Sequence, residues 1–276
     1  MTDSASGLIC PKCEQPLIAN GKQWQCPNRH SYDTAKQGYI NLLLVNQKKS
    51  KNPGDDADMV RARTDFLDTG IYAPISDALN AMVAADGVIL DIGCGEGYYT
   101  ERLQTHVPQA SVIGLDISRE AIKGACRRSK DITWLVASGA RPPVSAGTVD
   151  TIISLFTPLM PPGLNHALSD KGEIITVNTG PRHLMQLREL IYDDVRNEGF
   201  VPTAKMVDAG FECIEERVVT YTATVAGGEP LLALFNMTPH RWKVKPERVE
   251  KLLSVDSLTL EIDVVLHRFR RQTDTQ

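Results

Sequence analysis

Three cysteines and one histidine lie within 21 residues near the N-terminus, in the segment CPKCEQPLIANGKQWQCPNRH (10–30). Their spacing is Cys10-x2-Cys13-x12-Cys26-x3-His30. Two close pairs of soft ligands, separated by a dozen residues, are what a tetrahedral Zn²⁺ ion requires. Because four protein ligands would leave no open position for water or substrate, the spacing predicts a structural zinc site rather than a catalytic one.

The residues between the two ligand pairs predict a β-hairpin. Strands are expected at 17–19 and 23–25, joined by Asn20-Gly21, and Asn-Gly is the strongest two-residue hairpin signal. A module this small cannot bury enough apolar surface to fold alone, so a bound zinc ion would supply the missing folding free energy. The alternative is a chance grouping of reduced cysteines.

A glycine-rich turn forms the second candidate site, in GVILDIGCGEGYYTERL (87–103). Gly93, Gly95 and Gly97 would let the backbone approach a ligand closely, because they carry no Cβ. The dinucleotide fingerprint G-x-G-x-x-G/A competes, but Tyr98 stands where it needs a small residue. The observed G-x-G-x-G, preceded by Asp91, resembles motif I of class I S-adenosylmethionine (SAM) methyltransferases.

Asp116 ends a second predicted strand, SVIGLDIS (111–118), 19 residues beyond Gly97. In such folds an acid at this place accepts hydrogen bonds from the ribose hydroxyls of the cofactor. Many class I enzymes also carry an aspartate near the end of the third strand for adenine. Here Ser138 stands in that region, so no side chain is assigned to adenine. Together, the two motifs favour SAM over a nicotinamide cofactor.

Alternating strands and helices must position these motifs. A strand is predicted at 88–91, directly before the glycine turn, and further strands at 132–138, 149–156, 172–179, 212–225 and 258–269. Helices are predicted at 229–237 and 246–253, and a third runs to Arg128 with Ser118 as its N-terminal cap. The pattern predicts an α/β fold of the Rossmann-like, doubly wound class I methyltransferase type. Its sheet is expected to have seven strands with an antiparallel late strand, next to a small N-terminal zinc-binding domain.

The chain is expected to divide into three parts. Residues 1–35 form the zinc-binding module, 36–75 a linker and docking segment, and 76–276 the methyltransferase domain. Composition fits a globular protein, with 42% hydrophobic and 23% charged residues. No apolar run reaches the roughly 20 residues that span a bilayer, and no secretory signal is evident, so a cytoplasmic location without a membrane partner is expected.

Net charge is unevenly distributed along the sequence. The chain carries −4 overall, but residues 1–54 hold seven Lys/Arg and three Asp/Glu. A locally basic surface can bind phosphates even when the whole chain is acidic. A basic N-terminal part therefore suits nucleic acid, and an ordinary solvated surface is the alternative.

Over nearly its whole length the chain resembles the bacterial 23S rRNA guanine-N1 methyltransferases of the RlmA type. The resemblance rests on CPKC…CPNRH, AKQGYINLLL (35–44), NPGDDADMVRARTDFLDTGIYAPI (52–75), LDIGCGEGYYT (90–100) and TGPRHLMQLRELIY (179–192). It implies zinc ligation by Cys10, Cys13, Cys26 and His30. It also implies SAM contacts by Tyr72, Gly95, Glu96 and His183. The cofactor-binding residues already expected from the two motifs are Asp91, Gly93, Gly97 and Asp116.

The function implied by this resemblance is SAM-dependent methylation of a guanine N1 in hairpin 35 of 23S rRNA. Nucleotide 745 is favoured over 748, and a homodimer is implied, with the zinc module contacting RNA. Two alternatives stay open. One is a small-molecule SAM methyltransferase with an appended structural zinc module, and the other is a non-catalytic RNA-binding protein.

Methylation of guanine N1 requires a proton to leave, because N1 is protonated at neutral pH. The segment SLFTP (154–158) ends the fourth predicted strand of the domain and should border the target base, where Phe156 could stack on guanine. The segment contains no side chain that could accept the N1 proton. His183 is a weak candidate for the proton acceptor, cofactor positioning is its preferred role, and the acceptor is otherwise unassigned. The basic stretch HRWKVKPER (240–248) is a second candidate RNA contact or a connecting surface.

Overall fold

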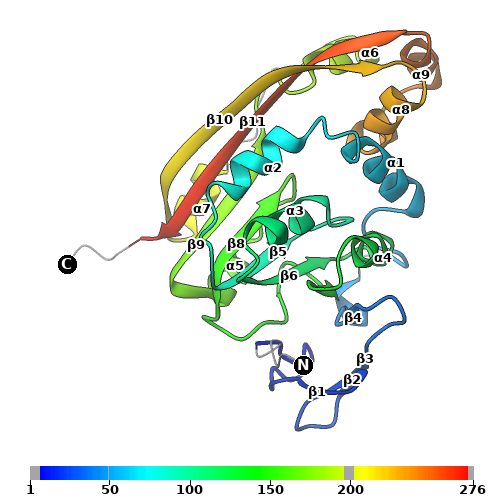
Figure 1. Ribbon diagram of the computed structural model, residues 1–276. Helices are drawn as coiled ribbons and strands as arrows, with labels where there is room; N and C mark the ends of the chain where they lie inside the picture. The colour runs from blue at the N-terminus through cyan, green and yellow to red at the C-terminus, as the bar shows by residue number, and fades with distance from the viewer. Residues whose placement is uncertain (1–6, 49, 196–201, 273–276) are drawn as a thin grey trace.

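The computed structural model describes residues 7–48, 50–195 and 202–272 of the chain. An eight-stranded sheet forms its centre, and a separate three-stranded sheet lies at the lower end of the view in Figure 1. The strands of the large sheet, in spatial order, are β10 (Phe211–Ala226), β11 (Ser257–Arg271), β9 (Leu168–Thr179), β8 (Val149–Leu155), β5 (Val88–Ile92), β6 (Ser111–Asp116), β7 (Thr133–Val136) and β4 (Ile40–Asn41).

The predicted doubly wound fold is confirmed. Strands β9, β8, β5, β6, β7 and β4 pair in parallel, while β11 runs antiparallel to both β9 and β10. The predicted number of seven strands is wrong, because β4 adds an eighth at the edge beside β7. This strand has two residues, which is too short for an alternating pattern to reveal it.

Helices cover one face of the large sheet. Apolar side chains of these helices share a hydrophobic core with Ile89 of β5 and Val112 of β6. The helices are α1 (Ala57–Leu67), α2 (Ala73–Asn80), α3 (Tyr98–His106), α4 (Arg119–Arg128), α6 (Met185–Ile191), α8 (Glu229–Asn236) and α9 (Pro246–Leu253). The predicted cap of α4 is confirmed, since the Ser118 hydroxyl accepts a hydrogen bond from the Ala121 amide.

The opposite face has a different cover. Leu90, Ile113 and Leu135 point to this side, where α5 (Pro161–Ala167) and α7 (Thr203–Asp208) pack on part of the sheet. The connection between β7 and β8, residues 137–148, contains no helix. Leu8 and other side chains of the N-terminal module lie in the same hydrophobic core and fill that place.

The N-terminal module is a small antiparallel ribbon. Its strands are β1 (Ile18–Asn20), β2 (Gln23–Gln25) and β3 (Ser31–Asp33). The predicted hairpin is confirmed, with Gly21 of the Asn-Gly turn at φ 62°. The third strand was not predicted from the sequence.

Residues 36–75, predicted to be a linker and docking segment, contribute regular structure to the domain. They include β4, the short 3₁₀ turn Val45–Gln47, α1 and the start of α2. A second 3₁₀ turn, Pro239–Trp242, links α8 to α9. The domain boundaries stay a prediction. Among the described residues, no helix has both the length and the apolar character needed to cross a membrane.

Candidate functional site

The four predicted zinc ligands converge at one point of the ribbon. The ligand atoms of Cys10, Cys13, Cys26 and His30 all lie within 4.8 Å of one another. The Sγ atoms of Cys13 and Cys26 are 3.6 Å apart, and Nδ1 of His30 is 3.5 Å from Sγ of Cys10 and of Cys26. Tetrahedral thiolate and imidazole ligands of Zn²⁺ lie about 3.6–3.8 Å apart, so this donor set fits the ion.

Tight turns bring each ligand pair together. The amides of Cys13 and Glu14 donate to the carbonyl of Cys10, and the amide of Arg29 donates to that of Cys26. Glu14 and Arg29 adopt left-handed backbone angles, with φ of 58° and 62°. Such angles are uncommon for residues with a Cβ, so the ribbon backbone is shaped around the cluster.

The ribbon is fastened to the methyltransferase sheet through the helix-free connection 137–148. The amide of Ile9 donates to the carbonyl of Pro143 over 3.0 Å, and the amide of Ser145 donates to the carbonyl of Gly7 over 2.7 Å. These two hydrogen bonds lie on either side of Leu8, whose side chain packs in the hydrophobic core. The zinc cluster therefore holds in shape a segment that also covers the sheet.

A cavity of about 400 Å³ opens at the carboxyl ends of the parallel strands. Its walls include the glycine turn after β5, the acid that ends β6, and residues 155–158, which comprise the last residue of β8 and the turn after it. This is the edge at which doubly wound folds bind ligands. The end of β7 contributes Ser138 and Gly139 to the wall, and the Ser138 hydroxyl accepts from the Ala140 amide over 3.3 Å.

Asp91 is the most buried charged group in the cavity wall, with 1% of its surface exposed. One carboxylate oxygen accepts a 2.6 Å hydrogen bond from the Thr100 hydroxyl, while the other, Oδ1, has no partner in the structure. Burial is the main cause that raises the pKa of Asp91 to about 7. A buried carboxylate oxygen without a partner fits a cationic ligand group, such as the ammonium of SAM.

Asp116 faces the same cavity from the end of β6. Its two oxygens accept hydrogen bonds from the amides of Gly95, over 3.0 Å, and Ser118, over 2.7 Å. Burial raises the pKa of Asp116, and these two bonds oppose that rise. Each carboxylate oxygen can accept a second hydrogen bond, so both remain able to receive a ribose hydroxyl.

The glycines of the turn serve two different purposes. A Cβ on Gly93 would lie 2.4 Å from the Thr157 hydroxyl, so glycine lets the cofactor turn touch the turn after β8. Gly97 does not line the cavity. A Cβ there would lie 2.9 Å from the Trp134 ring and 3.0 Å from Cβ of Ala125, so Gly97 permits close packing of α3 against α4 and β7.

Glu96 lines the cavity but its carboxylate is already occupied. Oε2 accepts from Nε of Arg128 over 2.8 Å and from the Tyr98 amide over 3.1 Å. Arg128 also pairs with the more exposed Asp68. Nε of Arg128 also lies 3.2 Å from the Glu96 carbonyl oxygen, so both the carboxylate and the carbonyl of Glu96 are engaged with α4.

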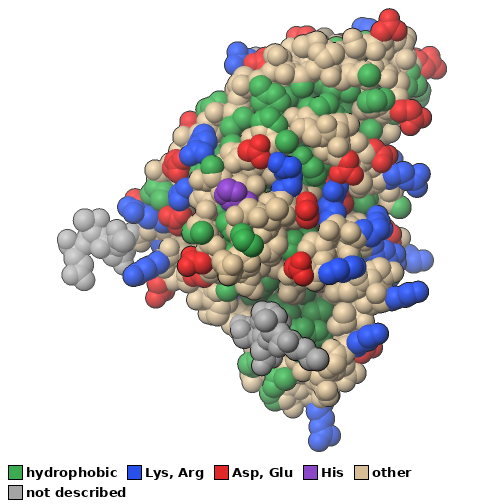
Figure 2. Space-filling model, viewed as in Figure 1, with side chains coloured by type: hydrophobic (Ala, Val, Ile, Leu, Met, Phe, Trp, Pro, Cys, Tyr) green, Lys and Arg blue, Asp and Glu red, His purple; other side chains and the backbone are tan. Residues whose placement is uncertain are grey.

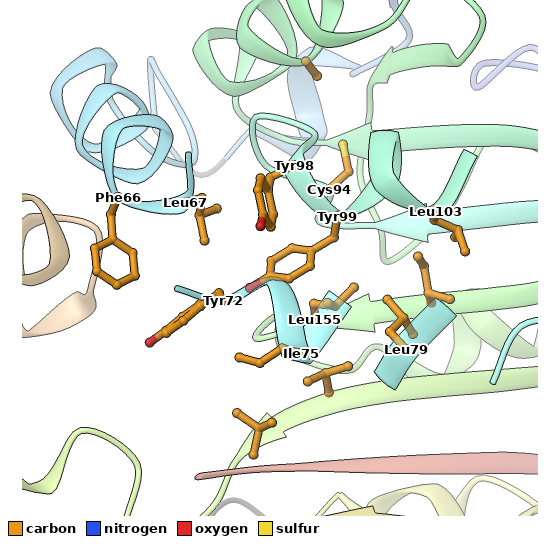
Figure 3. Packing of buried hydrophobic residues seen from close by; sticks show 14 of the residues in the cluster. Phe66, Leu67, Tyr72, Ile75, Leu79, Cys94, Tyr98, Tyr99, Leu103 and Leu155 are labelled. Atoms are coloured by element: carbon orange, nitrogen blue, oxygen red, sulfur yellow. The ribbon is translucent and has the colours of Figure 1, made fainter. Parts of the chain in front are cut away.

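Tyr72 and His183 lie beside the cavity and are not part of its wall. The two side chains are buried and joined by a 3.2 Å contact between Tyr72 Oη and His183 Nε2. Tyr72 packs its ring against Phe66, and Figure 3 shows the Tyr72 ring between those of Phe66 and Tyr99. His183 stacks on Phe156, which does line the cavity.

One loop that closes part of the cavity was not predicted from the sequence. Asp55 and Arg63 form an ion pair in the cavity wall. The Arg63 guanidinium lies beside the glycine turn, where a Cβ added to Gly95 would be 3.7 Å from it. The Ser118 hydroxyl donates to the carbonyl of Asp55 over 2.7 Å. This loop therefore connects α1 to the acid-bearing end of β6.

A signal for this loop was present in the sequence. NPGDDADMVRAR places acids and arginines at the start of a helix, but either arginine could have paired with several acids. In the structure Arg61 pairs with Asp58 on the surface, whereas Arg63 reaches Asp55. Only the three-dimensional arrangement distinguishes the two.

The basic stretch 240–248 lies outside the cavity wall. Trp242 is 65% exposed, and the guanidinium of Arg241 lies 4.4 Å from its ring centroid. Arg241 also approaches Asp56 at 3.7 Å, next to α1. The stretch therefore presents an exposed aromatic ring and basic side chains to solvent.

Two family models match the chain. The family described as "RlmA, N-terminal", a zinc ribbon, matches residues 8–51, and a methyltransferase domain family matches residues 89–172. The first contains the whole metal cluster, and the second contains the glycine turn and both cavity acids. Zinc and SAM are therefore the cofactors for which these two sites are built.

Two relatives match the chain over nearly its whole length. A 23S rRNA (guanine(748)-N(1))-methyltransferase of Streptomyces fradiae is 28% identical over 95% of this chain and 96% of its own length. YxjB of Bacillus subtilis, provisionally named a 23S rRNA (guanine-N(1)-)-methyltransferase, is 28% identical over 92% of this chain and 94% of its own.

Solved structures agree on the fold. A crystal structure of a Bacillus halodurans protein, BH2331, provisionally described as a methyltransferase, matches 74% of this chain and 100% of its own at a TM-score of 0.51 and 15% identity. At that identity the likeness shows the fold alone. The two family models and the full-length relatives together identify an RlmA-type enzyme, a SAM-dependent methyltransferase with a class I fold and an N-terminal Cys₃His zinc ribbon.

Proposed function

We propose that this enzyme transfers the methyl group of SAM to N1 of a guanine in 23S rRNA. The observation that carries the proposal is the unpartnered Oδ1 of Asp91, which lines the same cavity as Asp116. In the sequence this cavity domain follows an RlmA zinc ribbon. The names of the two full-length relatives support rRNA as the substrate and guanine N1 as the acceptor.

SAM, when bound, supplies an electrophilic methyl group on a sulfonium. Transfer of that methyl group to N1 would release the thioether product, and the N1 proton would pass to solvent. Asp91 would hold the ammonium of the methionyl part, and Asp116 the ribose hydroxyls. The backbone of Gly93 and Gly95 would lie along the ligand, while the turn after β8, packed on Gly93, excludes water from one side.

A basic surface supports an RNA substrate. Figure 2 shows Lys and Arg side chains gathered on the right-hand side of the view, over α4 and the β4 segment. Arg119 and Arg127 of α4 are exposed, and Lys48 and Lys51 follow β4 at a second cavity that shares Asp55 with the first. Phosphates would meet this surface between the ribbon and the cofactor cavity.

The finer assignments are part of the same proposal. We place the methylated guanine at nucleotide 745 of hairpin 35, whereas the S. fradiae relative is named for 748. The zinc ribbon would help to select the RNA, and the working form would be a cytoplasmic homodimer. Sedimentation of the zinc-loaded protein at micromolar concentration tests the dimer, and a single monomeric species contradicts it.

Purified zinc-loaded protein, methyl-labelled SAM and unmodified 23S rRNA test the proposed reaction. We expect label in 23S rRNA, recovered as 1-methylguanosine after nuclease digestion, and none in 16S rRNA. Asp116→Asn, which keeps the size of the side chain, should abolish most of the label. Transfer to a small metabolite but not to rRNA would contradict the proposal, and so would RNA binding without any transfer.

A further inference from the structure

Backbone strain marks two places in the described part of the chain. Its non-glycine residues with positive φ are Glu14, Arg29, Phe156 and Leu184. Glu14 and Arg29 shape the zinc turns. Phe156 has φ 52° and Leu184 has φ 54°. Both lie at one aromatic contact, because the ring of His183, the residue before Leu184, stacks on the ring of Phe156. Strain of this kind persists where surrounding structure enforces it, and it concentrates at functional sites.

Phe156 is placed at the mouth of the cavity. It follows β8 directly, its amide donates to the carbonyl of Val177 over 2.9 Å, and 40% of its surface is exposed. The next residue, Thr157, touches Gly93 of the cofactor turn. The exposed ring therefore stands beside the position that a bound cofactor would take.

Two aromatic side chains support the ring from the protein side. The His183 ring lies nearly parallel to it, with centroids 6.2 Å apart and planes at 28°. The Tyr99 ring lies 6.4 Å away, tilted by 56°. With these contacts on the inside, the ring keeps part of its surface open to the cavity.

His183 is itself fixed from both ends. Nδ1 accepts a hydrogen bond from the Asp263 amide over 3.3 Å, which places the proton on Nε2, and Nε2–H donates to Tyr72 Oη over 3.2 Å. Burial lowers the pKa of His183 to about 4, so the ring is neutral near pH 7. Because both nitrogens are engaged, this histidine is arranged to hold a position and not to receive a proton.

We infer that the exposed surface of Phe156 is a stacking shelf for the target purine, and that His183 is the positioning residue behind it. The inference rests on the proposed function, which supplies a base that must leave its helix to reach the cofactor. An extruded base is commonly held by stacking on an aromatic side chain. Stacking orients the plane of guanine while leaving its N1 edge free to face the methyl group.

The test compares Phe156→Leu with Phe156→Trp in the zinc-loaded full-length protein. Leucine keeps bulk without a π face, so we expect kcat/KM for RNA to fall roughly 10- to 100-fold while the SAM dissociation constant stays within about twofold. The Phe156→Trp variant, which keeps a π face, should retain most of the wild-type kcat/KM for RNA. Val218→Ala, on the exposed side of β10 and away from the cavity, serves as the control and should match the wild type.

A fluorescence readout reports stacking directly. The probe is a hairpin 35 transcript with 2-aminopurine in place of the methylated guanine. Wild-type protein should quench its emission on binding, and Phe156→Leu should not. Full RNA activity or undiminished quenching in Phe156→Leu overturns the shelf. If the wild-type protein methylates no RNA, the proposed function is wrong, and the stacking role of Phe156 is wrong with it.

The role of His183 is separated from that of a base by substitution. His183→Phe keeps a flat neutral ring, so it should retain much more activity than His183→Ala, whose loss should appear as a higher KM for RNA. The pH profile of His183→Phe should follow that of the wild type. A rate loss in His183→Phe with unchanged KM and an altered pH profile would identify a proton acceptor and overturn the positioning role.

Discussion

The zinc cluster and the cofactor cavity gather polar side chains in opposite ways. In the cluster the four ligand atoms face one another within 4.8 Å, as a closed donor set. In the cavity Asp91 and Asp116 face open volume, and one Asp91 oxygen has no partner. A closed set is completed by an ion and stabilises the fold, whereas an open set is completed by a ligand that enters and leaves.

The two regions are joined by the connection between β7 and β8. Ser138 and Gly139 of this connection line the cavity, and Pro143 to Ser145 hold the ribbon through backbone hydrogen bonds. The ribbon takes the place of a covering helix on that face of the sheet. The comparison therefore predicts that metal loss affects stability first and cofactor affinity much less.

Removal of zinc should have the largest effect. A chelator, or Cys10→Ser, should unfold the ribbon and expose Leu8 and Leu17, lowering the free energy of unfolding by several kcal/mol. Urea denaturation followed by circular dichroism measures this, and rRNA methylation should be lost in parallel. Cys213→Ser, half-buried on β10 and outside the cluster, is the matched control.

SAM affinity in the same zinc-free protein sharpens the comparison. We expect the dissociation constant to change by only a few fold, because both cavity acids belong to β5 and β6. An equal loss of SAM binding and stability would show that the ribbon is required to form the cavity.

Asp116→Ala should weaken SAM binding by about 1.5–3 kcal/mol, since charge-assisted hydrogen bonds to the ribose are lost. Isothermal titration calorimetry provides the measurement. Asp77→Ala removes an exposed carboxylate paired with Arg102 and should leave the affinity unchanged. An Asp116→Ala protein that binds SAM as the wild type does would refute the placement of the ribose.

SAM affinity should depend on pH through Asp91. Its pKa in the free protein, about 7, lies above the ordinary 3.8, so a growing fraction is protonated and neutral as pH falls through 7. A neutral carboxyl cannot pair with the ammonium, so binding should be roughly fivefold weaker at pH 6 than at pH 7. Asp91→Asn should bind weakly with a flat profile over this range, and a wild-type profile that is equally flat would contradict the pairing.

Glu14→Gln should have the smallest effect. Glu14 pairs with Arg141 between the ribbon and the connection, but both side chains are largely exposed to solvent. Exposed ion pairs contribute about 0–1 kcal/mol, so the melting temperature should fall by no more than a few degrees. A loss as large as that of Cys10→Ser would mean that charge, and not apolar contact, docks the ribbon.

Local patterns in the sequence were enough to predict the elements that carry the chemistry. The zinc ligands, the Asn-Gly hairpin, the glycine turn and Asp116 all lie within short segments whose spacing is set by the ligand or by the strand. The two late strands and the cap of α4 were predicted for the same reason. Each depends on residues that are neighbours in the chain.

The features that the sequence did not predict depend on distant residues. The contact of Tyr72 with His183 joins positions 111 residues apart, and the stacking of Phe156 on His183 requires the ends of β8 and β9 to be in place. The covering of a sheet face by the ribbon follows from the lack of a helix in the connection 137–148. Periodicity within a segment carries no information about such packing.

Mapping the methylated nucleotide in cells tests the central claim most directly. Reverse transcription of 23S rRNA stops at 1-methylguanosine, so wild-type cells should give a stop at one guanine of hairpin 35. A deletion strain should lose that stop, the intact gene should restore it, and an Asp116→Asn gene should not. A stop that persists in the deletion strain would contradict the account.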